Sequence, residues 1–424
     1  MTANMERAAV VGVWAKGAGP REEASLAELK RLLETAGGTA VAEIIQERAR
    51  PDPATLMGRG KAEEIANLAR QARLSAVVVD AELSPTQQRN LQEIVPAKII
   101  DRTRLILDIF AQRARTREGK LQVELAQMNY LLPRATEKFG RFEQQTGGIG
   151  TRGPGERKLE ISQRRIRERI VRLRQEMEAV GRQRALRRDN RRRTPLPLIA
   201  LVGYTNAGKS TLLNALNTGP APDVYADDRL FATLDPTTRR VKLPGGRMAL
   251  LVDTVGFIQN LPHHLVAAFR ATLEEARDAD MLLHVVDTAD PAWPTHADVV
   301  TDVLKDLAAD ALPQLTVHNK ADVLTPAQRA QHERRGDVLV SARTGEGLPR
   351  LLAALEKRLD AALEERTVFL PHDRRSLLPL FYAAGRVLGE KSAPGGTRLR
   401  AMLSPSNWGR FESALGADSK GQKK

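Results

Sequence analysis

Two kinds of hydrophobic pattern alternate along the first hundred residues. Apolar runs at 8–14, 41–45, 76–80 and 97–100 predict short strands, and leucines and isoleucines at helical spacing predict helices between them. Strands that alternate with helices are typical of βαβ units and of a mainly parallel sheet. We therefore predict an N-terminal α/β domain over residues 1–115.

The apolar spacing then becomes purely helical over residues 116–190. Two series of apolar residues step by three, four or seven positions, which is the spacing of a coiled-coil seam. Between them, residues 147–155 contain five glycines and cannot build a core of their own. The pattern predicts an antiparallel helical hairpin with a glycine-rich tip. The two seams consist of Leu121, Leu125, Met128 and Leu132, and of Leu159, Ile166, Ile170, Leu173, Met177 and Val180.

The strand pattern returns after a basic, proline-containing linker at 191–197. Buried strands at 198–202 and 248–252 belong to a series that alternates with helical segments. This series predicts a second α/β domain over residues 198–366, with a mixed sheet flanked by helices. Residues 367–424 contain further strand and helix segments, which predict a small C-terminal α/β domain and a basic tail.

Composition narrows the class of protein. The chain has 424 residues, of which 42% are hydrophobic and 28% charged, as expected of several globular domains. No apolar run approaches the roughly 18 residues of a membrane span, and charged residues interrupt the N-terminus too early for a secretory signal. The absence of cysteine excludes disulfides and thiolate metal sites and is consistent with a reducing compartment.

The charge balance points to a polyanionic partner. The net charge is +14, and residues 156–193 alone contain 15 Arg and Lys against 6 Asp and Glu. Such a run is usually a solvated face, but on a projecting hairpin it favours an arm laid against RNA phosphates. With only 4% aromatic residues, base stacking is disfavoured, so we expect phosphate contact and shape recognition, without DNA specificity.

A phosphate-binding loop begins the second α/β domain. The apolar run 198–202 leads into G-x-x-x-x-G-K-S, and leucines at helical spacing follow. A strand, a glycine-bounded loop and a helix form the context in which this motif cradles a polyphosphate with backbone N–H groups. Lys209 would reach the β- and γ-phosphates, and Ser210 would bind Mg²⁺. The predicted loop residues are Gly203, Tyr204, Thr205, Asn206, Ala207, Gly208, Lys209, Ser210 and Thr211.

Two switch segments are expected downstream. A strand ends in D-x-x-G, whose Asp253 could hold Mg²⁺ through water and whose Gly256 N–H could sense a γ-phosphate. Between the motifs, residues 231–239 offer hydroxyls for a loop that closes over Mg²⁺. By position we prefer Thr233, with Thr237 and Thr238 as alternatives. The other residues predicted to contact nucleotide here are Phe231, Ala232, Leu234, Asp235, Thr254 and Val255.

Two further motifs are expected to bind the base of the nucleotide. N-K-x-D follows a strand, and its Asp322 carboxylate suits the N1–H and 2-amino donors of guanine, which adenine lacks on that edge. Asn319 would bind the base edge and brace the loop, while the stem of Lys320 would cover the ring. Ser341, Ala342 and Arg343 would supply backbone donors to guanine O6. The sequence therefore predicts a GTPase that prefers GTP to ATP.

The sequence also bears on the rate of GTP hydrolysis. Many GTPases orient the attacking water with a glutamine just after D-x-x-G, but here that position is Phe257. We therefore predict slow unaided turnover and stimulation by a partner. Lys209, Gly256 and Asn206 are the predicted catalytic residues, and the amide of Asn206 either helps to hold K⁺ against the phosphates or only braces the loop. The pair His263 and His264 lacks a third ligand at suitable spacing, so we read it as a helix start.

Beyond these motifs the chain resembles the HflX family of ribosome-associated GTPases, within the translation-factor-related GTPases. The segments that carry the resemblance are 83–91, 122–127, 150–156, 231–239 and 253–257. The resemblance covers residues from about 5 to 365. It implies binding to the large ribosomal subunit and its rRNA, with the helical and glycine-loop region near the peptidyl-transferase region, and action on stalled or idle ribosomes. Arg157 and Lys158 depart from the uncharged residues usual in the family.

The expected function is therefore a Mg²⁺-dependent, guanine-selective GTPase that acts in ribosome splitting, rescue or biogenesis. We expect a cytoplasmic, ribosome-associated monomer. Two alternatives belong to other classes: an ATP-driven RNA remodeller that uses residues 58–61 as a phosphate contact, and a signalling GTPase peripheral to membranes. For residues 58–61 a basic loop entering a helix is favoured, and the basic helix lacks the aromatic face of an interfacial helix.

Overall fold

The computed structural model describes residues 6–15, 17, 19–135, 154–193, 196–219, 230–231, 233, 236–259 and 275–415. Its contacts divide the chain into two compact units. The first comprises Met1–Gln183, Asp227–Asp235 and Ile258–Ala271, and the second comprises Arg184–Ala226, Pro236–Phe257 and Thr272–Lys424.

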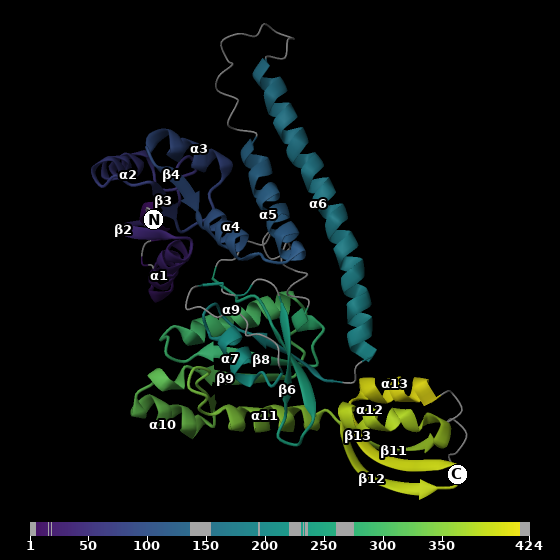
Figure 1. Cartoon of the computed structure of the whole chain (residues 1–424). Helices are drawn as coiled ribbons and strands as arrows, with labels where there is room; N and C mark the ends of the chain where they lie inside the picture. The colour runs from purple at the N-terminus through teal and green to yellow at the C-terminus, as the bar shows by residue number, and fades with distance from the viewer. Residues whose placement is uncertain are drawn as a thin grey trace. The chain divides into compact units, whose positions relative to one another are not determined.

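The first unit begins with a four-stranded parallel sheet in the order β2-β1-β3-β4 (Figure 1). All four residues of β3 are buried because both faces of the sheet are covered. The parallel sheet predicted from the alternating pattern is confirmed. The strands are β1 (Glu6–Trp14), β2 (Gly38–Glu47), β3 (Ala76–Val79) and β4 (Lys98–Asp101), and the connecting helices are α1 (Pro20–Thr35), α2 (Arg59–Gln71) and α3 (Pro85–Ile94).

Helix α4 (Arg102–Arg113) joins this sheet to the helical region through a buried polar cluster. Asp101 caps the helix by accepting from the Arg104 N–H at 2.8 Å, and its carboxylate also accepts from Tyr130 at 3.0 Å. Arg102, which is 2% exposed, forms ion pairs with Glu28 and with Asp80. A buried arginine needs such partners, since an unpaired buried charge is strongly destabilising.

Helices α5 (Arg117–Ala135) and α6 (Pro154–Arg193) lie side by side (Figure 1). Leu121 and Leu125 of α5 pack with Ile170 and Leu173 of α6, so the predicted seams do meet. Arg169 of α6 also binds Glu124 through two hydrogen bonds of 2.7 and 2.9 Å. Most of the predicted glycine-rich tip, residues 147–153, lies outside the described residues.

The predicted limits of the second helix need correction at both ends. Helix α6 begins at Pro154, so the last two residues assigned to the glycine-rich tip are helical. It continues to Arg193, so residues 191–193 of the expected linker are helical too. Arginine is a good helix former, and the first proline after Arg193 is Pro195, so the helix can extend beyond the apolar seam.

The second unit contains a six-stranded sheet in the order β10-β9-β8-β5-β7-β6. Strand β6 runs antiparallel to β7 and the other neighbours are parallel, so the predicted mixed sheet is confirmed. The strands are β5 (Leu198–Val202), β6 (Thr237–Lys242), β7 (Met248–Asp253), β8 (Met281–Asp287), β9 (Gln314–Asn319) and β10 (Val338–Leu339). The helices are α7 (Lys209–Leu216), α9 (Trp293–Asp306), α10 (Pro326–Arg335) and α11 (Leu348–Ala361), with a 3₁₀ turn at Ala321–Val323.

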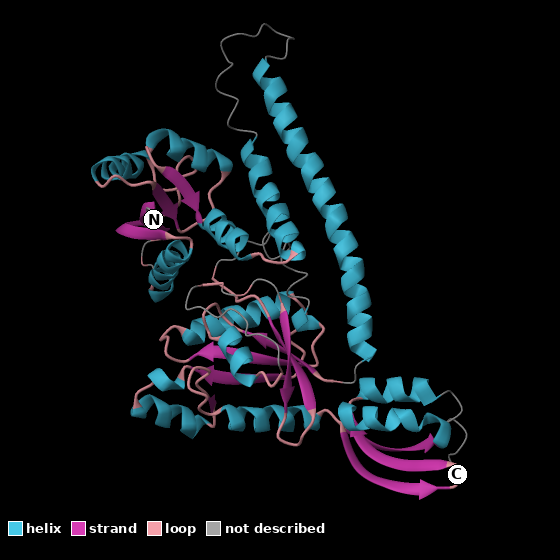
Figure 2. Cartoon of the chain, viewed as in Figure 1, coloured by secondary structure: helices cyan, strands magenta, loops and turns pink. Residues whose placement is uncertain are grey.

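The C-terminal part of this unit is a three-stranded antiparallel sheet in the order β11-β13-β12. Figure 2 shows its two helices together on one side of the strands. Phe381, Trp408 and Phe411 fill the space between helices and sheet. Strand β11 (Glu364–Pro371) begins three residues before the predicted boundary at 367, and the other elements are β12 (Arg386–Ala393), β13 (Gly396–Leu403), α12 (Leu378–Ala384) and α13 (Pro405–Leu415), with a 3₁₀ turn at His372–Leu377.

Candidate nucleotide-binding site

The loop between β5 and α7 is held in a shape that requires glycine at both ends. Gly203 has φ +154°, and a Cβ there would lie 2.3 Å from the carbonyl oxygen of Val285. Gly208 has φ +88°, and its Cβ would lie 2.2 Å from Nδ2 of Asn319. Both positions therefore require a residue without a Cβ, and the glycines of the motif give the loop the backbone shape that curls around phosphates.

Lys209 is buried beneath this loop. Its ammonium donates to the carbonyl oxygens of Gly203 and Tyr204 at 3.1 and 2.8 Å. Burial lowers the pKa of Lys209 from its ordinary 10.5 to about 8, and the nearby carboxylate of Asp253 opposes that shift only in part. Within the described part of the chain this ammonium donates to loop carbonyls and forms no ion pair, and a polyphosphate would provide it with a strong anionic partner.

Ser210 and Asp253 meet where β5 and β7 run side by side. The Ser210 hydroxyl donates to Asp253 Oδ2 at 2.6 Å, and both residues are buried. Hydroxyl and carboxylate oxygens are the donors that Mg²⁺ prefers, so this pair fits the ion. Thr254, the next residue, donates to the Leu201 carbonyl at 2.6 Å and ties the D-x-x-G segment to β5.

The third predicted Mg²⁺ ligand belongs to the first unit. Thr233 is buried there, while Ala232, Leu234 and Asp235 lie outside the described residues. Its two alternatives, Thr237 and Thr238, lie in β6, in register with Asp253 and Val252. Their backbones are fixed in the sheet ladder, so they are less suited than Thr233 to a loop that moves.

The end of D-x-x-G is attached directly to the phosphate loop. The Thr205 N–H donates to the Phe257 carbonyl at 2.8 Å, and the Phe257 N–H donates to the Gly203 carbonyl at 3.1 Å. A Cβ on Gly256 would lie 2.8 Å from Thr205 Cα and 3.0 Å from Lys209 Nζ. The Phe257 side chain is 2% exposed, so it lies in the interior rather than where a water could attack.

The base-recognition motifs are joined by Asn319. Its Nδ2 donates to the Ala207 carbonyl at 2.8 Å, and its Oδ1 accepts from the Ala342 N–H at 3.0 Å. The side chain is 2% exposed and braces the phosphate loop against residues 341–343. This geometry agrees with the bracing role expected of Asn319.

Asp322 lies at the edge of the same region. Its carboxylate accepts from the Ser341 hydroxyl and from the Arg343 guanidinium, each at 2.7 Å. Burial raises its pKa, but these two hydrogen bonds outweigh that effect and hold the pKa of Asp322 below its ordinary value. The group is therefore an acceptor at neutral pH, as the reading of guanine N1–H and 2-amino groups requires.

Two residues that contact the motifs, Asp287 and His296, were not predicted from the sequence. Asp287, at the end of β8, forms a 2.7 Å ion pair with Lys320, whose backbone has φ +63°. The ring of Tyr204 stacks on His296, with centroids 3.9 Å apart and an angle of 8°. Asp287 could have been recognised as an acidic residue at the end of a buried strand, whereas nothing in the sequence marks His296.

Asn206 of the phosphate loop has φ +60°, so the loop holds it in a left-handed conformation.

Part of the predicted first switch segment, residues 231–235, and the residues that follow the D-x-x-G segment, 258–271, belong to the first unit. The Leu230 N–H donates to Thr35 Oγ1 at 3.2 Å, and Phe231 packs edge-on against Phe110 with centroids 4.6 Å apart. Arg102 donates to the Gln259 carbonyl at 3.1 Å. The sequence patterns indicated none of these contacts, since the partners are separated by more than a hundred residues.

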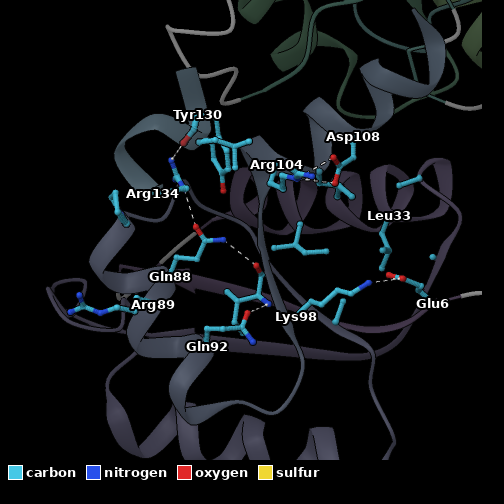
Figure 3. A pocket seen from close by; sticks show the side chains of 18 of the residues that line it. Glu6, Leu33, Gln88, Arg89, Gln92, Lys98, Arg104, Asp108, Tyr130 and Arg134 are labelled. Atoms are coloured by element: carbon cyan, nitrogen blue, oxygen red, sulfur yellow. Dashed lines mark hydrogen bonds and ion pairs between the residues drawn. The ribbon is translucent and has the colours of Figure 1, made fainter. Parts of the chain in front are cut away.

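The first unit also has a cavity of about 1310 Å³ between its sheet and its helices (Figure 3). Its charged lining is largely paired: Lys98 binds Glu6 at 2.9 Å, Arg104 binds Asp108 at 3.1 Å, and Arg134 binds Gln88 at 2.9 Å. The lining does not include residues 58–61. Those residues form the start of α2, where Arg59 and Lys61 form ion pairs with Glu63 and Glu64. The reading of 58–61 as a helix entry is confirmed.

The fold and the site together define a GTP-binding protein of the phosphate-loop class. Four family models match consecutive parts of the chain: the N-terminal domain of GTP-binding GTPases at residues 23–111, the middle region of these GTPases at 113–191, a 50S ribosome-binding GTPase domain at 198–320 and an HflX C-terminal domain at 326–424. The chain belongs to the HflX family of GTPases. It is a GTP-hydrolysing enzyme that binds GTP and GDP.

Relatives named GTPase HflX match nearly the whole chain. That of Caldanaerobacter subterraneus subsp. tengcongensis is 43% identical over 399 residues, which cover 94% of this chain and 91% of that protein. That of Magnetococcus marinus is 47% identical over 393 residues, covering 92% and 90%. That of Escherichia coli is 44% identical over 391 residues, covering 91% of each.

The remaining expectations concern membrane segments and the paired histidines. None of the described helices is both long and apolar enough to cross a membrane. His263 and His264 lie outside the described residues, so the reading of that pair as a helix start stays a prediction.

Proposed function

We propose that this GTPase requires Mg²⁺, binds the large ribosomal subunit according to its bound nucleotide, and acts in ribosome splitting, rescue or biogenesis. The observation that carries the proposal is the 2.6 Å contact between Ser210 and Asp253 beside a buried Lys209, in a chain whose G domain matches a 50S ribosome-binding family. Lysine, hydroxyl and carboxylate are the groups that GTPases use for polyphosphate and Mg²⁺.

The residues have separable roles in this proposal. Lys209 would exchange its two loop carbonyls for β- and γ-phosphate oxygens and neutralise charge that develops in hydrolysis. Ser210, Asp253 and Thr233 would hold Mg²⁺, which supplies positive charge to the phosphates when bound. The Gly256 N–H would report the γ-phosphate, and Asn319 with Asp322 would hold guanine.

A slow intrinsic rate follows from Phe257. Its side chain is buried and has no hydrogen-bonding group, so it cannot orient the attacking water. The partner would then accelerate hydrolysis by ordering the switch segments, including Thr233. We therefore expect purified large subunits to raise kcat for GTP at saturating Mg²⁺.

The ribosome-binding surface that we propose is the exposed face of α6. Arg165, Arg167, Arg172, Arg174 and Arg182 are exposed on this helix, whereas its opposite face packs on α5. Arginines in such an array contact phosphates with little dependence on base sequence. The site of action is then the cytoplasm, on the ribosome.

The test uses the full chain and purified large subunits. Changing Arg165, Arg167 and Arg174 to Glu should weaken binding and reduce the salt dependence of the affinity, by about one unit of log–log slope for each phosphate that the arm no longer neutralises. A matched control changes three exposed basic residues of the C-terminal sheet, Arg386, Lys391 and Arg398, to Glu. Equal loss of binding in both triple variants would contradict the assignment to α6.

The two alternative functions gain no support. The residues that an ATP-driven remodeller would use, 58–61, begin a helix and form local ion pairs. A membrane-peripheral role would require an apolar face on α6, but Ile166, Ile170, Leu173, Met177 and Val180 pack in the seam with α5, and Val171 is the only large apolar side chain exposed among the described residues 163–182. Sedimentation with anionic vesicles separates this alternative from RNA binding.

A further inference from the structure

Three metal-ligating side chains gather in the second unit, and none of them is among the residues assigned to nucleotide binding. His318 lies in β9, His332 lies in the last turn of α10, and Asp337 follows that helix. One ligand atom from each lies within 4.8 Å of the others. His332 Nδ1 lies 2.8 Å and His318 Nε2 lies 3.7 Å from the same oxygen, Oδ2 of Asp337. Nothing in the nucleotide chemistry uses this cluster.

We propose that His318, His332 and Asp337 bind one divalent transition-metal ion of the zinc type. Two imidazoles and a carboxylate are ligands that zinc accepts, with water as the fourth ligand. Ligands about 2.0–2.1 Å from a tetrahedral ion lie about 3.3 Å from one another. The two separations to Asp337, 2.8 and 3.7 Å, bracket that value, and all three ligand atoms lie within 4.8 Å of one another, so small side-chain movements would complete the site.

The two ring nitrogens of His318 differ in their surroundings. Nε2 lies on the side of Asp337, and Nδ1 is buried with no hydrogen-bond partner among the described residues. A neutral imidazole carries its proton on one nitrogen only, so Nε2 can present its lone pair to an ion when the proton is on Nδ1.

A purely hydrogen-bonded cluster explains only part of this geometry. The 2.8 Å contact between His332 and Asp337 is an ordinary hydrogen bond at a helix C-terminus. His318 is different, since its Nε2 lies 3.7 Å from the carboxylate, too far for a hydrogen bond. An ion between the two rings and the carboxylate would bond to this nitrogen and would explain why a second ring points at a carboxylate that already binds His332.

The surroundings would shelter such an ion. His318 and His332 are 5% and 7% exposed, and Trp293 packs edge-on against His318 with ring centroids 5.3 Å apart. Asp337 is partly exposed and provides a route from solvent.

The site adjoins the base-recognition motif. His318 directly precedes Asn319, and the Val340 N–H donates to the His318 carbonyl at 2.8 Å. An ion held by His318, His332 and Asp337 would therefore fix the end of β9 against α10 and the segment that leads to Ser341. Because binding effects are reciprocal, zinc should tighten GDP binding and GDP should tighten zinc binding by the same factor.

The experiment measures zinc binding to the full chain by equilibrium dialysis, with Mg·GDP saturating so that the nucleotide pocket takes no zinc. We expect one zinc per chain in the wild type, and binding at least about tenfold weaker in H318Q and H332Q. The matched control is H372Q, which changes an exposed histidine of the C-terminal part and should bind as the wild type does. A second control, H263Q with H264Q, separates the proposed site from the other histidine pair.

Cobalt provides a readout that does not depend on activity. Co²⁺ in the wild type should give the intense visible bands of a four-coordinate ion, and these should disappear in H332Q. If a histidine variant fails to fold, D337N is used, since it keeps the shape of a partly exposed side chain and removes the carboxylate. Unchanged zinc stoichiometry in H318Q, H332Q and D337N, or no stoichiometric zinc in the wild type, would overturn the proposal.

Discussion

Replacing Gly208 with alanine tests how the phosphate loop is held in shape. The new Cβ would lie 2.2 Å from Asn319 Nδ2, so the asparagine would have to move. The left-handed backbone at φ +88° adds a cost of about 1–2 kcal/mol for a residue with a Cβ. Displacing Asn319 also breaks its bonds to Ala207 and Ala342, and each buried group left unsatisfied costs about 1–3 kcal/mol.

Gly246→Ala is the matched control. Gly246 has φ +87°, nearly the same as Gly208, but no described atom would lie within 4 Å of its Cβ. Both variants therefore share the backbone penalty, and only Gly208→Ala loses the two bonds of Asn319. The difference of about 2–6 kcal/mol should appear as a loss of GDP affinity of about 30-fold or more.

The assay is a fluorescence titration with a labelled GDP, together with urea unfolding of both variants. Urea unfolding reports the total cost to the nucleotide-free folded protein, which should be larger for Gly208→Ala than for Gly246→Ala, and the titration reports the part that affects GDP binding. If Gly208→Ala bound GDP within about threefold of Gly246→Ala, the bracing role of Asn319 would be refuted.

Three further predictions concern the same pocket. Asp322→Asn should move nucleotide preference from guanosine to xanthosine phosphates, measured by competition, and unchanged GTP selectivity would contradict the assignment. Replacing Na⁺ with K⁺ should speed hydrolysis if the Asn206 amide helps to hold the ion, and equal rates in the two salts would remove that reading. The pKa of Lys209 is about 8 in the folded, nucleotide-free protein and 10.5 in the unfolded chain. Between these pH values Lys209 holds a proton in the unfolded chain that it has lost in the folded protein, so the free energy of unfolding should rise with pH. Urea unfolding should show this rise in the wild type and not in Lys209→Met.

The fold could be predicted where the apolar residues of the sequence are also the residues that the structure buries. The run at Ala76–Val79 is apolar throughout, as a strand covered on both faces requires, so the parallel sheet could be predicted. The seams around Leu125 and Leu173 likewise placed α5 against α6. The ends of α6 were predicted wrongly because Pro154 suits a first helical turn and arginine propagates a helix, while both lie outside any apolar seam.

The nucleotide site was largely predictable because each motif stands at a strand end. Parallel strands bring their carboxyl ends to one edge of the sheet, so Ser210 after β5 and Asp253 on β7 had to meet. The contacts of Phe231 with Phe110 and of Gln259 with Arg102 could not be predicted, since they join segments far apart in the sequence through side chains that no motif marks. The cluster of His318, His332 and Asp337 was missed for a related reason, because its spacing matches no metal-binding motif.

The most direct test of the account is the affinity of the full chain for purified large ribosomal subunits, measured by sedimentation with a non-hydrolysable GTP analogue and with GDP. Binding should be at least about tenfold tighter with the analogue, which corresponds to a coupling of about 1.4 kcal/mol between the nucleotide pocket and the ribosome-binding surface. Equal affinity in the two nucleotide states would contradict it.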